Sequence, residues 1–211
     1  MDATEQLLKD LTEAHGVPGF ENEIRAVVRP MLASVGEVTT DNLGSLVCEM
    51  EGEGPRVLMM AHMDEIGFMV RHITKEGFIK FIQLGGWWDQ VLLGHRVIIK
   101  TRKGDVLGVI GAKPPHLVEA DERSKVVEKK KMYIDIGVSS AAEVEEAGVK
   151  IGDYIVPDSS FEVMVNGKTY VSKAFDDRVG CAVMIEAMNN LKQIGSPNKV
   201  FGVASVQEEV G

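Results

Sequence analysis

The chain has 211 residues, 45% of them hydrophobic, which is enough for one domain with a sizeable core or for a core domain with a smaller insert. Its 32 acidic residues outnumber its 23 basic ones, and the formal charge of -9 argues against a nucleic-acid partner. The N-terminus lacks the basic and apolar regions of a signal peptide, and no apolar run reaches the roughly 18 residues of a membrane helix. We therefore expect a cytoplasmic protein with no membrane partner.

Two helices are predicted near the N-terminus. Apolar residues recur at helical spacing over residues 4–14, and Gly16 follows as a stop signal. A second helical pattern runs over residues 21–35. Pro30 lies inside it and is expected to kink or divide the helix, because proline lacks the backbone N–H that the helix needs.

Strands follow these helices. Residues 38–50 predict a hairpin that turns at Asp41 and Asn42, and residues 55–65 predict a buried strand that ends in polar side chains. Between about 66 and 165 the sequence consists of short strand-like runs separated by glycines, with one helical pattern at 140–148. Strands at such regular spacing indicate a small barrel or sandwich.

Helical and strand patterns return after residue 166. Residues 180–195 predict an amphipathic helix and residues 198–207 a strand. We therefore predict an α/β fold interrupted by an all-β, barrel-like insert. The predicted domains are an α/β domain, 1–66 plus 166–211, and a β-rich insert, 67–165.

The first candidate site residues are His62 and Asp64, which end the strand predicted over residues 55–65. Side chains two positions apart on a strand share a face, so these two project together. A carboxylate that accepts the second imidazole N–H fixes the ring as a metal ligand requires. A single His-x-Asp is weak evidence for a metal site, because a partly exposed histidine at a strand end gives the same pattern more often.

The second candidates are Asp176 and Asp177, just before the helix predicted over residues 180–195. Aspartates at a helix start are often N-caps that the helix dipole favours. Capping explains one aspartate better than two. A carboxylate at such a junction is also placed to bridge two cations.

The third candidates are Glu208 and Glu209, which follow the apolar strand ending near Val206. Open α/β sheets place their sites at this carboxyl end of the strands. Two neighbouring carboxylates cannot both remain ionised and unpaired there. Metal-assisted hydrolysis would resolve this, with one acid as a ligand and the other taking a proton from water.

Four stretches together resemble a known family: AHMDEIG at 61–67, GAKPPHL at 111–117, KAFDDRVG at 173–180 and QEEVG at 207–211. Their order around a β-rich insert is similar to that of the M42 metallo-aminopeptidases, which include the tetrahedral and glutamyl aminopeptidases. The resemblance covers all 211 residues. It implies a mixed-sheet, phosphorylase/hydrolase-like catalytic domain that uses two divalent metal ions, zinc or cobalt.

The resemblance also implies roles for the candidate residues. His62 and Glu209 correspond to metal ligands, Asp176 to the carboxylate that bridges both metals, and Asp64 to the residue that orients the histidine. Glu208 corresponds to the general base. By resemblance to related metallopeptidases, the peptide bond after Asp176 is expected to be cis.

Family members also supply a further aspartate and a further histidine ligand beyond the EEVG motif, and this chain contains neither. The sequence therefore resembles a family member truncated after that motif, and we expect the 211 residues alone to be inactive. The resemblance implies short peptides as substrates. It also implies a homo-oligomer built from dimers through the insert, since family members form large, often dodecameric shells.

Two other functions remain open. Paired carboxylates also serve glycoside hydrolases of the endoglucanase type, which need no metal. His62 and Asp176 would then have no task, and 6% aromatic residues are few for binding sugars. The other alternative is a non-catalytic assembly subunit, in which the insert mediates subunit contacts and the site is inert.

Overall fold

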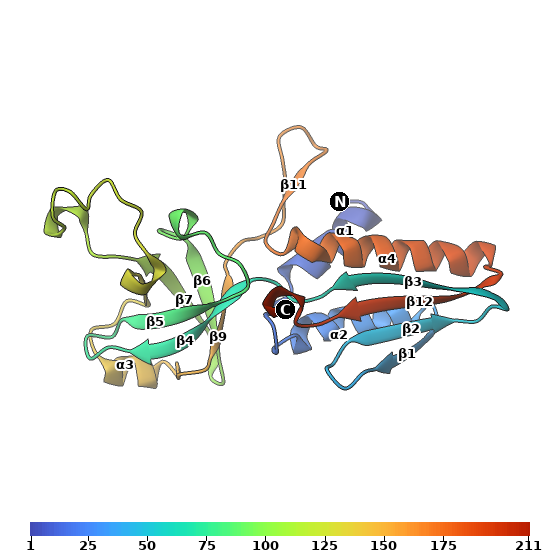
Figure 1. The fold of residues 1–211 in the computed structure, drawn as a ribbon, viewed down its shortest axis with the longest axis horizontal. Coiled ribbons are helices and arrows are strands. Elements are labelled where there is room, and N and C mark those ends of the chain that lie inside the picture. The colour runs from blue at the N-terminus through green and yellow to red at the C-terminus, as the bar shows by residue number, and fades with distance from the viewer. The chain divides into compact units, whose positions relative to one another are not determined.

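The computed structural model describes residues 1–211, which divide into two compact units. Unit 1 comprises Met1–Glu65 and Ser159–Gly211, and unit 2 comprises Ile66–Asp158 (Figure 1). The sequence placed these boundaries at 66/67 and 165/166. No helix combines the length and apolar character needed to cross a membrane.

Unit 1 is a four-stranded mixed sheet with three helices against one face. Its strands run in the order β1-β2-β12-β3, and only the β12–β3 pair is parallel. The strands are β1 (Glu37–Thr40), β2 (Leu46–Met50), β3 (Gly54–His62) and β12 (Asn198–Ser205). The helices are α1 (Ala3–Glu13), α2 (Asn22–Ala33) and α4 (Phe175–Ile194). A separate hairpin of β10 (Glu162–Val163) and β11 (Tyr170–Val171) completes the unit.

The core of unit 1 lies between the helices and the sheet. Leu11, Ile24 and Met188 contribute fully buried side chains from α1, α2 and α4, and they pack with Leu46 and Ala204 of the sheet. The apolar spacing that predicted these helices is therefore the spacing of their buried faces.

Helix α2 runs without interruption through Pro30, so the expected division of this helix does not occur. Three residues after the proline the helix reaches its last residue, Ala33, and Ser34 donates its backbone N–H to the Pro30 carbonyl at 3.2 Å. The missing N–H therefore falls in the last turn of the helix, where it removes only one of many hydrogen bonds.

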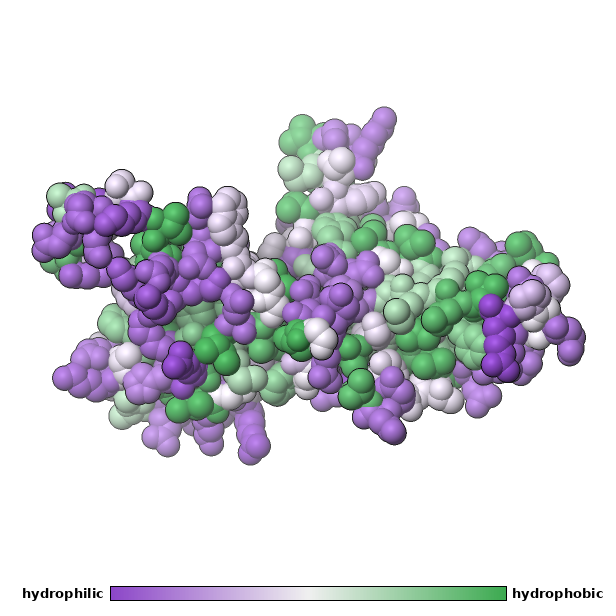
Figure 2. All heavy atoms as spheres, in the orientation of Figure 1, coloured by the Kyte–Doolittle hydropathy of each residue, from purple (hydrophilic) through white to green (hydrophobic).

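The strand predicted as buried, β3, is an edge strand, and this prediction was wrong. Leu58 is 61% exposed and Met60 66% exposed, and apolar side chains gather over β3 and α4 in Figure 2. An apolar run signals that burial is favourable, but the strand pairs only with β12 in the sheet. Ala61 and His62, at its carboxyl end, are buried.

Unit 2 is a closed barrel, as the spacing of its strands predicted. The strands follow the order β4-β5-β8-β7-β6-β9. They are β4 (Gly67–Ile73), β5 (Ile79–Leu84), β6 (Arg96–Thr101), β7 (Gly104–Gly111), β8 (Tyr133–Asp135) and β9 (Tyr154–Pro157). The helix α3 (Ala141–Glu146) lies within the helical stretch predicted at 140–148. Phe68 is fully buried and stacks on Trp87 with ring centroids 4.8 Å apart. Closure leaves the barrel without a free edge.

Candidate functional site

The parallel pair β3–β12 brings the first and third candidate segments together. Ser205, the last residue of β12, lies opposite His62, the last residue of β3. Both strands therefore end at the same edge of the sheet, where ligands of α/β folds are usually bound. Glu208 and Glu209 follow in a short 3-10 turn, and the start of α4 supplies Asp176.

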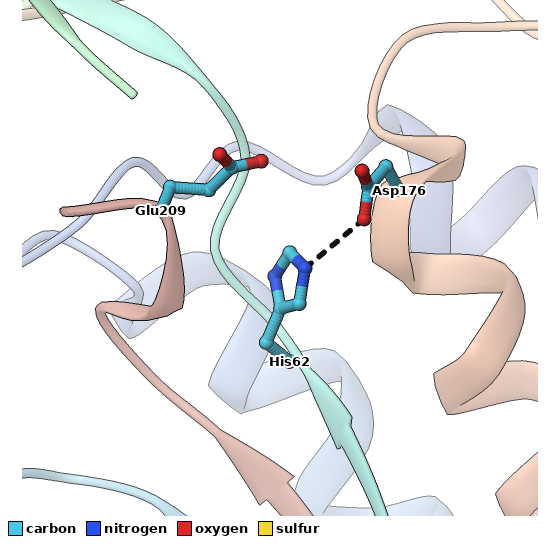
Figure 3. A group of neighbouring side chains, drawn as sticks. All are labelled: His62, Asp176 and Glu209. Atoms are coloured by element: carbon cyan, nitrogen blue, oxygen red, sulfur yellow. Dashed lines mark hydrogen bonds and ion pairs between the residues drawn. The ribbon is translucent and has the colours of Figure 1, made fainter. Parts of the chain in front are cut away.

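The His62 ring is held with one nitrogen directed into the site. Its Nδ1 lies 3.0 Å from the backbone oxygen of Asp64 and 3.5 Å from that residue's carboxylate. A carbonyl oxygen only accepts, so Nδ1 carries the proton and donates it. In the neutral ring Nε2 then presents its lone pair, 3.1 Å from Asp176 Oδ1 (Figure 3). The same nitrogen lies 3.7 Å from Glu208 Oε2. This is the tautomer that a metal-ligating histidine needs.

The two aspartates at the start of α4 have different roles. Asp177 Oδ1 accepts the backbone N–H of Gly180 at 3.2 Å, which is the capping contact expected at a helix start. Asp176 instead directs its carboxylate toward His62, and its side chain is 87% exposed. The peptide bond between them is cis, as the resemblance implied. Capping thus accounts for Asp177 and leaves Asp176 available for binding.

Asp64 holds the turn that carries the paired glutamates. Its carboxylate, which is fully buried, accepts the backbone N–H of Glu208 at 3.1 Å and that of Glu209 at 3.0 Å. Gln207, which opens the turn in the left-handed region at φ 60°, donates its N–H to the buried Glu21 carboxylate at 3.2 Å. The position of both glutamates therefore depends on Asp64 more directly than the sequence indicated.

The charges of the site shift the pKa values of its members. Burial alone would lower the pKa of His62, but hydrogen bonds and the charge of Asp64, with Asp176, raise it from 6.5 to about 9. Burial raises the pKa of Asp64, yet its bonds to His62 and to the two glutamate N–H groups outweigh burial and lower it. Burial and the neighbouring carboxylates raise the pKa of Glu209.

These shifts and contacts fit a cation. Neutral Nε2 of His62 and the Asp176 carboxylate are both acceptors, so their 3.1 Å separation requires a proton or a cation between them. One ligand atom each from His62, Asp176 and Glu209 lie within 4.8 Å of one another. One imidazole nitrogen and two carboxylate oxygens form a donor set that suits zinc and several other divalent metals.

Four buried residues around the site were not identified from the sequence. Glu21 supports the turn of the paired glutamates, while Glu65, Lys173 and Arg178 form a buried ionic cluster next to Asp64 and Asp176. Their signal was present, since Glu65 adjoins Asp64 and the other two flank the aspartate pair. Charge close to a motif is usually solvated, however, and only the fold shows that these charges are buried.

Comparison with known proteins decides the family. A family model described as M42 glutamyl aminopeptidase matches residues 44–211, and one described as AMPT matches residues 2–28. The chain belongs to the M42 family. It is 43% identical to FrvX of Escherichia coli (strain K12) over 209 residues, which is 98% of this chain and 58% of FrvX.

Solved structures of M42 peptidases share the fold. The TET aminopeptidase of the marine sediment archaeon Thaumarchaeota archaeon SCGC AB-539-E09 is 50% identical, with a TM-score of 0.96 over 100% of this chain and 60% of that one. The chain is 38% identical to the Pyrococcus horikoshii TET1 peptidase, with a TM-score of 0.88 over 99% of this chain and 62% of that one. That peptidase can assemble into a tetrahedron or a large octahedral shell. An endoglucanase from Thermotoga maritima is 34% identical, with a TM-score of 0.79 over 96% of this chain and 59% of that one. The chain thus spans about three fifths of these M42 relatives' length.

Proposed function

We propose that this chain carries part of a two-metal aminopeptidase site that removes N-terminal residues from short peptides. One observation carries the proposal: His62, Asp176 and Glu209 converge from three segments distant in sequence, with Glu208 beside them, in a chain of the M42 family. The proposed metal ligands are His62, Asp176 and Glu209, with Asp176 as the bridging carboxylate. We propose zinc or cobalt as the metal.

The chain's own residues would divide the work of hydrolysis. A bound divalent cation would polarise the scissile carbonyl and make a nearby water more acidic. Glu208 acts as the general base that takes the proton of the attacking water and returns it to the leaving amine. Its side chain is 62% exposed, with an oxygen 3.7 Å from His62 Nε2, so it reaches the site while remaining open to substrate. Asp64 positions His62 and both glutamates.

Metal content and activity test this function together. We expect the purified chain to retain divalent metal after dialysis, and His62→Ala and Glu209→Ala to reduce it. Glu208→Gln should keep the metal, because Glu208 is proposed as the base and not as a ligand. Any hydrolysis of aminoacyl p-nitroanilides and short peptides should be lost in that variant and in the presence of a chelator.

Each alternative function makes a different prediction. An endoglucanase with paired carboxylates would cleave β-glucans in the presence of a chelator. If the chain is a non-catalytic subunit, the His62→Ala variant would assemble like the wild type and show no change in metal content or in hydrolysis. Absence of bound metal from the wild-type chain would contradict the proposed site.

We also propose that unit 2 is the insert through which copies of the chain associate. The support is the TET1 relative, which can assemble into shells, together with exposed apolar side chains on unit 2: Trp88 is 65% exposed and Leu93 45% exposed. Trp88→Ala should shift the sedimentation of any oligomer toward smaller species. The cytoplasmic location stays a prediction.

A further inference from the structure

Three charged side chains are buried directly behind the candidate metal site. Glu65 is 1% exposed, Lys173 8% and Arg178 0%. Glu65 follows Asp64 in the chain, while Lys173 and Arg178 lie three residues before and two residues after Asp176. The cluster is therefore attached by covalent chain to both sides of the site.

Arg178 ties the start of α4 to the end of β3. Its Nε donates to the backbone oxygen of Met63, at 2.5 Å, and Met63 stands between His62 and Asp64. Its Nη1 donates to the carbonyls of Leu11 at 2.5 Å and Ala14 at 3.1 Å, near the C-terminal end of α1. Carbonyls at a helix C-terminus attract cations, so this anchor is electrostatically favourable.

Lys173 joins the same three segments through different contacts. Its Nζ donates to Glu65 Oε1 at 2.6 Å and to the Ala14 carbonyl at 3.0 Å. The same Glu65 oxygen accepts the backbone N–H of Gly16 at 3.2 Å, and the Glu65 N–H donates to the Gly16 carbonyl at 2.8 Å. The end of α1, the end of β3 and the start of α4 thus meet at one carboxylate.

Stability alone does not account for these buried charges. Burying ions costs several kcal/mol each, and well-packed apolar replacements are often as stable. Burial lowers the pKa of both Lys173 and Arg178, so each loses solvation that its partners must replace. Arg178 Nη2 and Glu65 Oε2 have no hydrogen-bond partner, so the cluster is not fully satisfied. The hydrogen bonds of the cluster instead fix the positions of the chain segments, because each cation joins defined backbone atoms of different segments.

We infer that Glu65, Lys173 and Arg178 are positioning residues that set the distance between Asp176 and His62, and so determine the metal affinity of the site. The inference rests on the metal site under the proposed function. Asp176 is 87% exposed and has no other anchor to the sheet besides its contact with His62. Its position is therefore set by the chain on either side of it, which the two cations hold.

Metal titration of two variants tests the inference. Lys173→Met keeps the length of the side chain without its donors, and Arg178→Lys keeps the charge but loses the fork that joins Met63 to Leu11. We expect each to weaken Zn²⁺ binding about 10- to 100-fold, the effect usual for partners that orient metal ligands. The Co²⁺ absorption bands at saturating metal should also change, because they report ligand geometry.

Leu32→Ala is the matched control. Leu32 is a fully buried residue of α2 in the same core, so its truncation destabilises unit 1 without removing a contact of the cluster. All titrations are done where circular dichroism shows each variant to be folded. Leu32→Ala should bind Zn²⁺ within about twofold of wild type, with unchanged Co²⁺ bands.

The outcomes separate this inference from the proposed function. Wild-type Zn²⁺ affinity in both folded cluster variants would overturn the inference and leave the metal site standing. If only one of the two variants folds, wild-type Zn²⁺ affinity in that variant alone would overturn the inference. Equal weakening in Leu32→Ala would also overturn it, because a general loss of stability would then explain the effect. A wild-type chain that binds no metal would refute the proposed site itself.

Discussion

Asp64→Asn tests most directly how the site is held together. The Asp64 carboxylate is fully buried and accepts two backbone N–H groups, from Glu208 at 3.1 Å and from Glu209 at 3.0 Å. Asparagine keeps one acceptor oxygen and replaces the other by an NH₂ group, which cannot accept. One of the two N–H groups then faces a donor and loses its bond, and the other loses its charged partner.

The expected loss of stability follows from these two bonds. A hydrogen bond to a charged group contributes about 1.5–3 kcal/mol, and a neutral one about 0.5–1.5 kcal/mol. Losing one charged bond and reducing the other to a neutral one gives about 2.5–4.5 kcal/mol of lost unfolding free energy for unit 1. The pKa of His62 should fall from about 9 toward its ordinary 6.5 at the same time, because Asp64 is the main group that raises it.

Urea unfolding measures this loss. The helices α1, α2 and α4 belong to unit 1, while Trp87 and Trp88 both belong to unit 2. We therefore expect Asp64→Asn to shift the ellipticity transition at 222 nm more than the tryptophan fluorescence transition. Asp121→Asn is the matched control, because Asp121 is 76% exposed in its pair with Lys125 and should change stability by under about 0.5 kcal/mol.

The pH dependence gives a second check on the same reasoning. The folded pKa of Asp64 is lowered, so its stabilising contribution is present above the ordinary carboxyl pKa of about 3.9 and is lost as the pH falls through the folded value. The difference between wild type and Asp64→Asn should accordingly shrink in acid. A difference at pH 7 no larger than that of the Asp121→Asn control would refute the assigned role of Asp64.

Three further predictions concern other residues. If His62 is a metal ligand as proposed, metal competes with its proton, so metal affinity should rise about tenfold per pH unit and level off near pH 9. Calorimetric titrations that show no dependence on pH would contradict this. Phe68→Ala should cost unit 2 about 3–5 kcal/mol, read from the fluorescence of its stacking partner Trp87 during unfolding; an unmoved transition would contradict the barrel core. A Cβ at Gly36 would approach the Glu49 carbonyl oxygen far below contact distance, so Gly36→Ala should cost about 1–3 kcal/mol in the 222 nm transition, and unchanged stability would contradict this packing.

Sequence and structure agree best where a pattern is local. The spacing of apolar residues over 4–14 and 180–195 predicted helices, because helical period and core contact are the same constraint. Short strands separated by glycines predicted the barrel for a similar reason, since each strand must alternate its faces between core and solvent. The tertiary structure corrected two local predictions: Pro30 does not divide α2, and β3 is an edge strand.

The candidate site was predictable as a set of residues but not as an arrangement. His62, Asp176 and Glu209 each lie near the end or start of a predicted element, where a polar side chain next to an apolar segment requires a binding partner. The division between Asp176 and Asp177 depended on which carboxylate the helix N-terminus uses, and only the fold shows that Asp177 takes the cap.

The sequence by itself determined the element types, the β-rich insert, the chemistry of the candidate ligands and the family resemblance. Only the tertiary structure decided that β12 pairs in parallel with β3, with Ser205 opposite His62, and that Asp64 holds the turn of Glu208 and Glu209. It alone revealed the buried charges of Lys173 and Arg178. The physical reason is the distance along the sequence over which each signal acts. Periodicity reflects only whether a residue favours burial, whereas contacts between residues 100 or more positions apart depend on the packing of the whole unit.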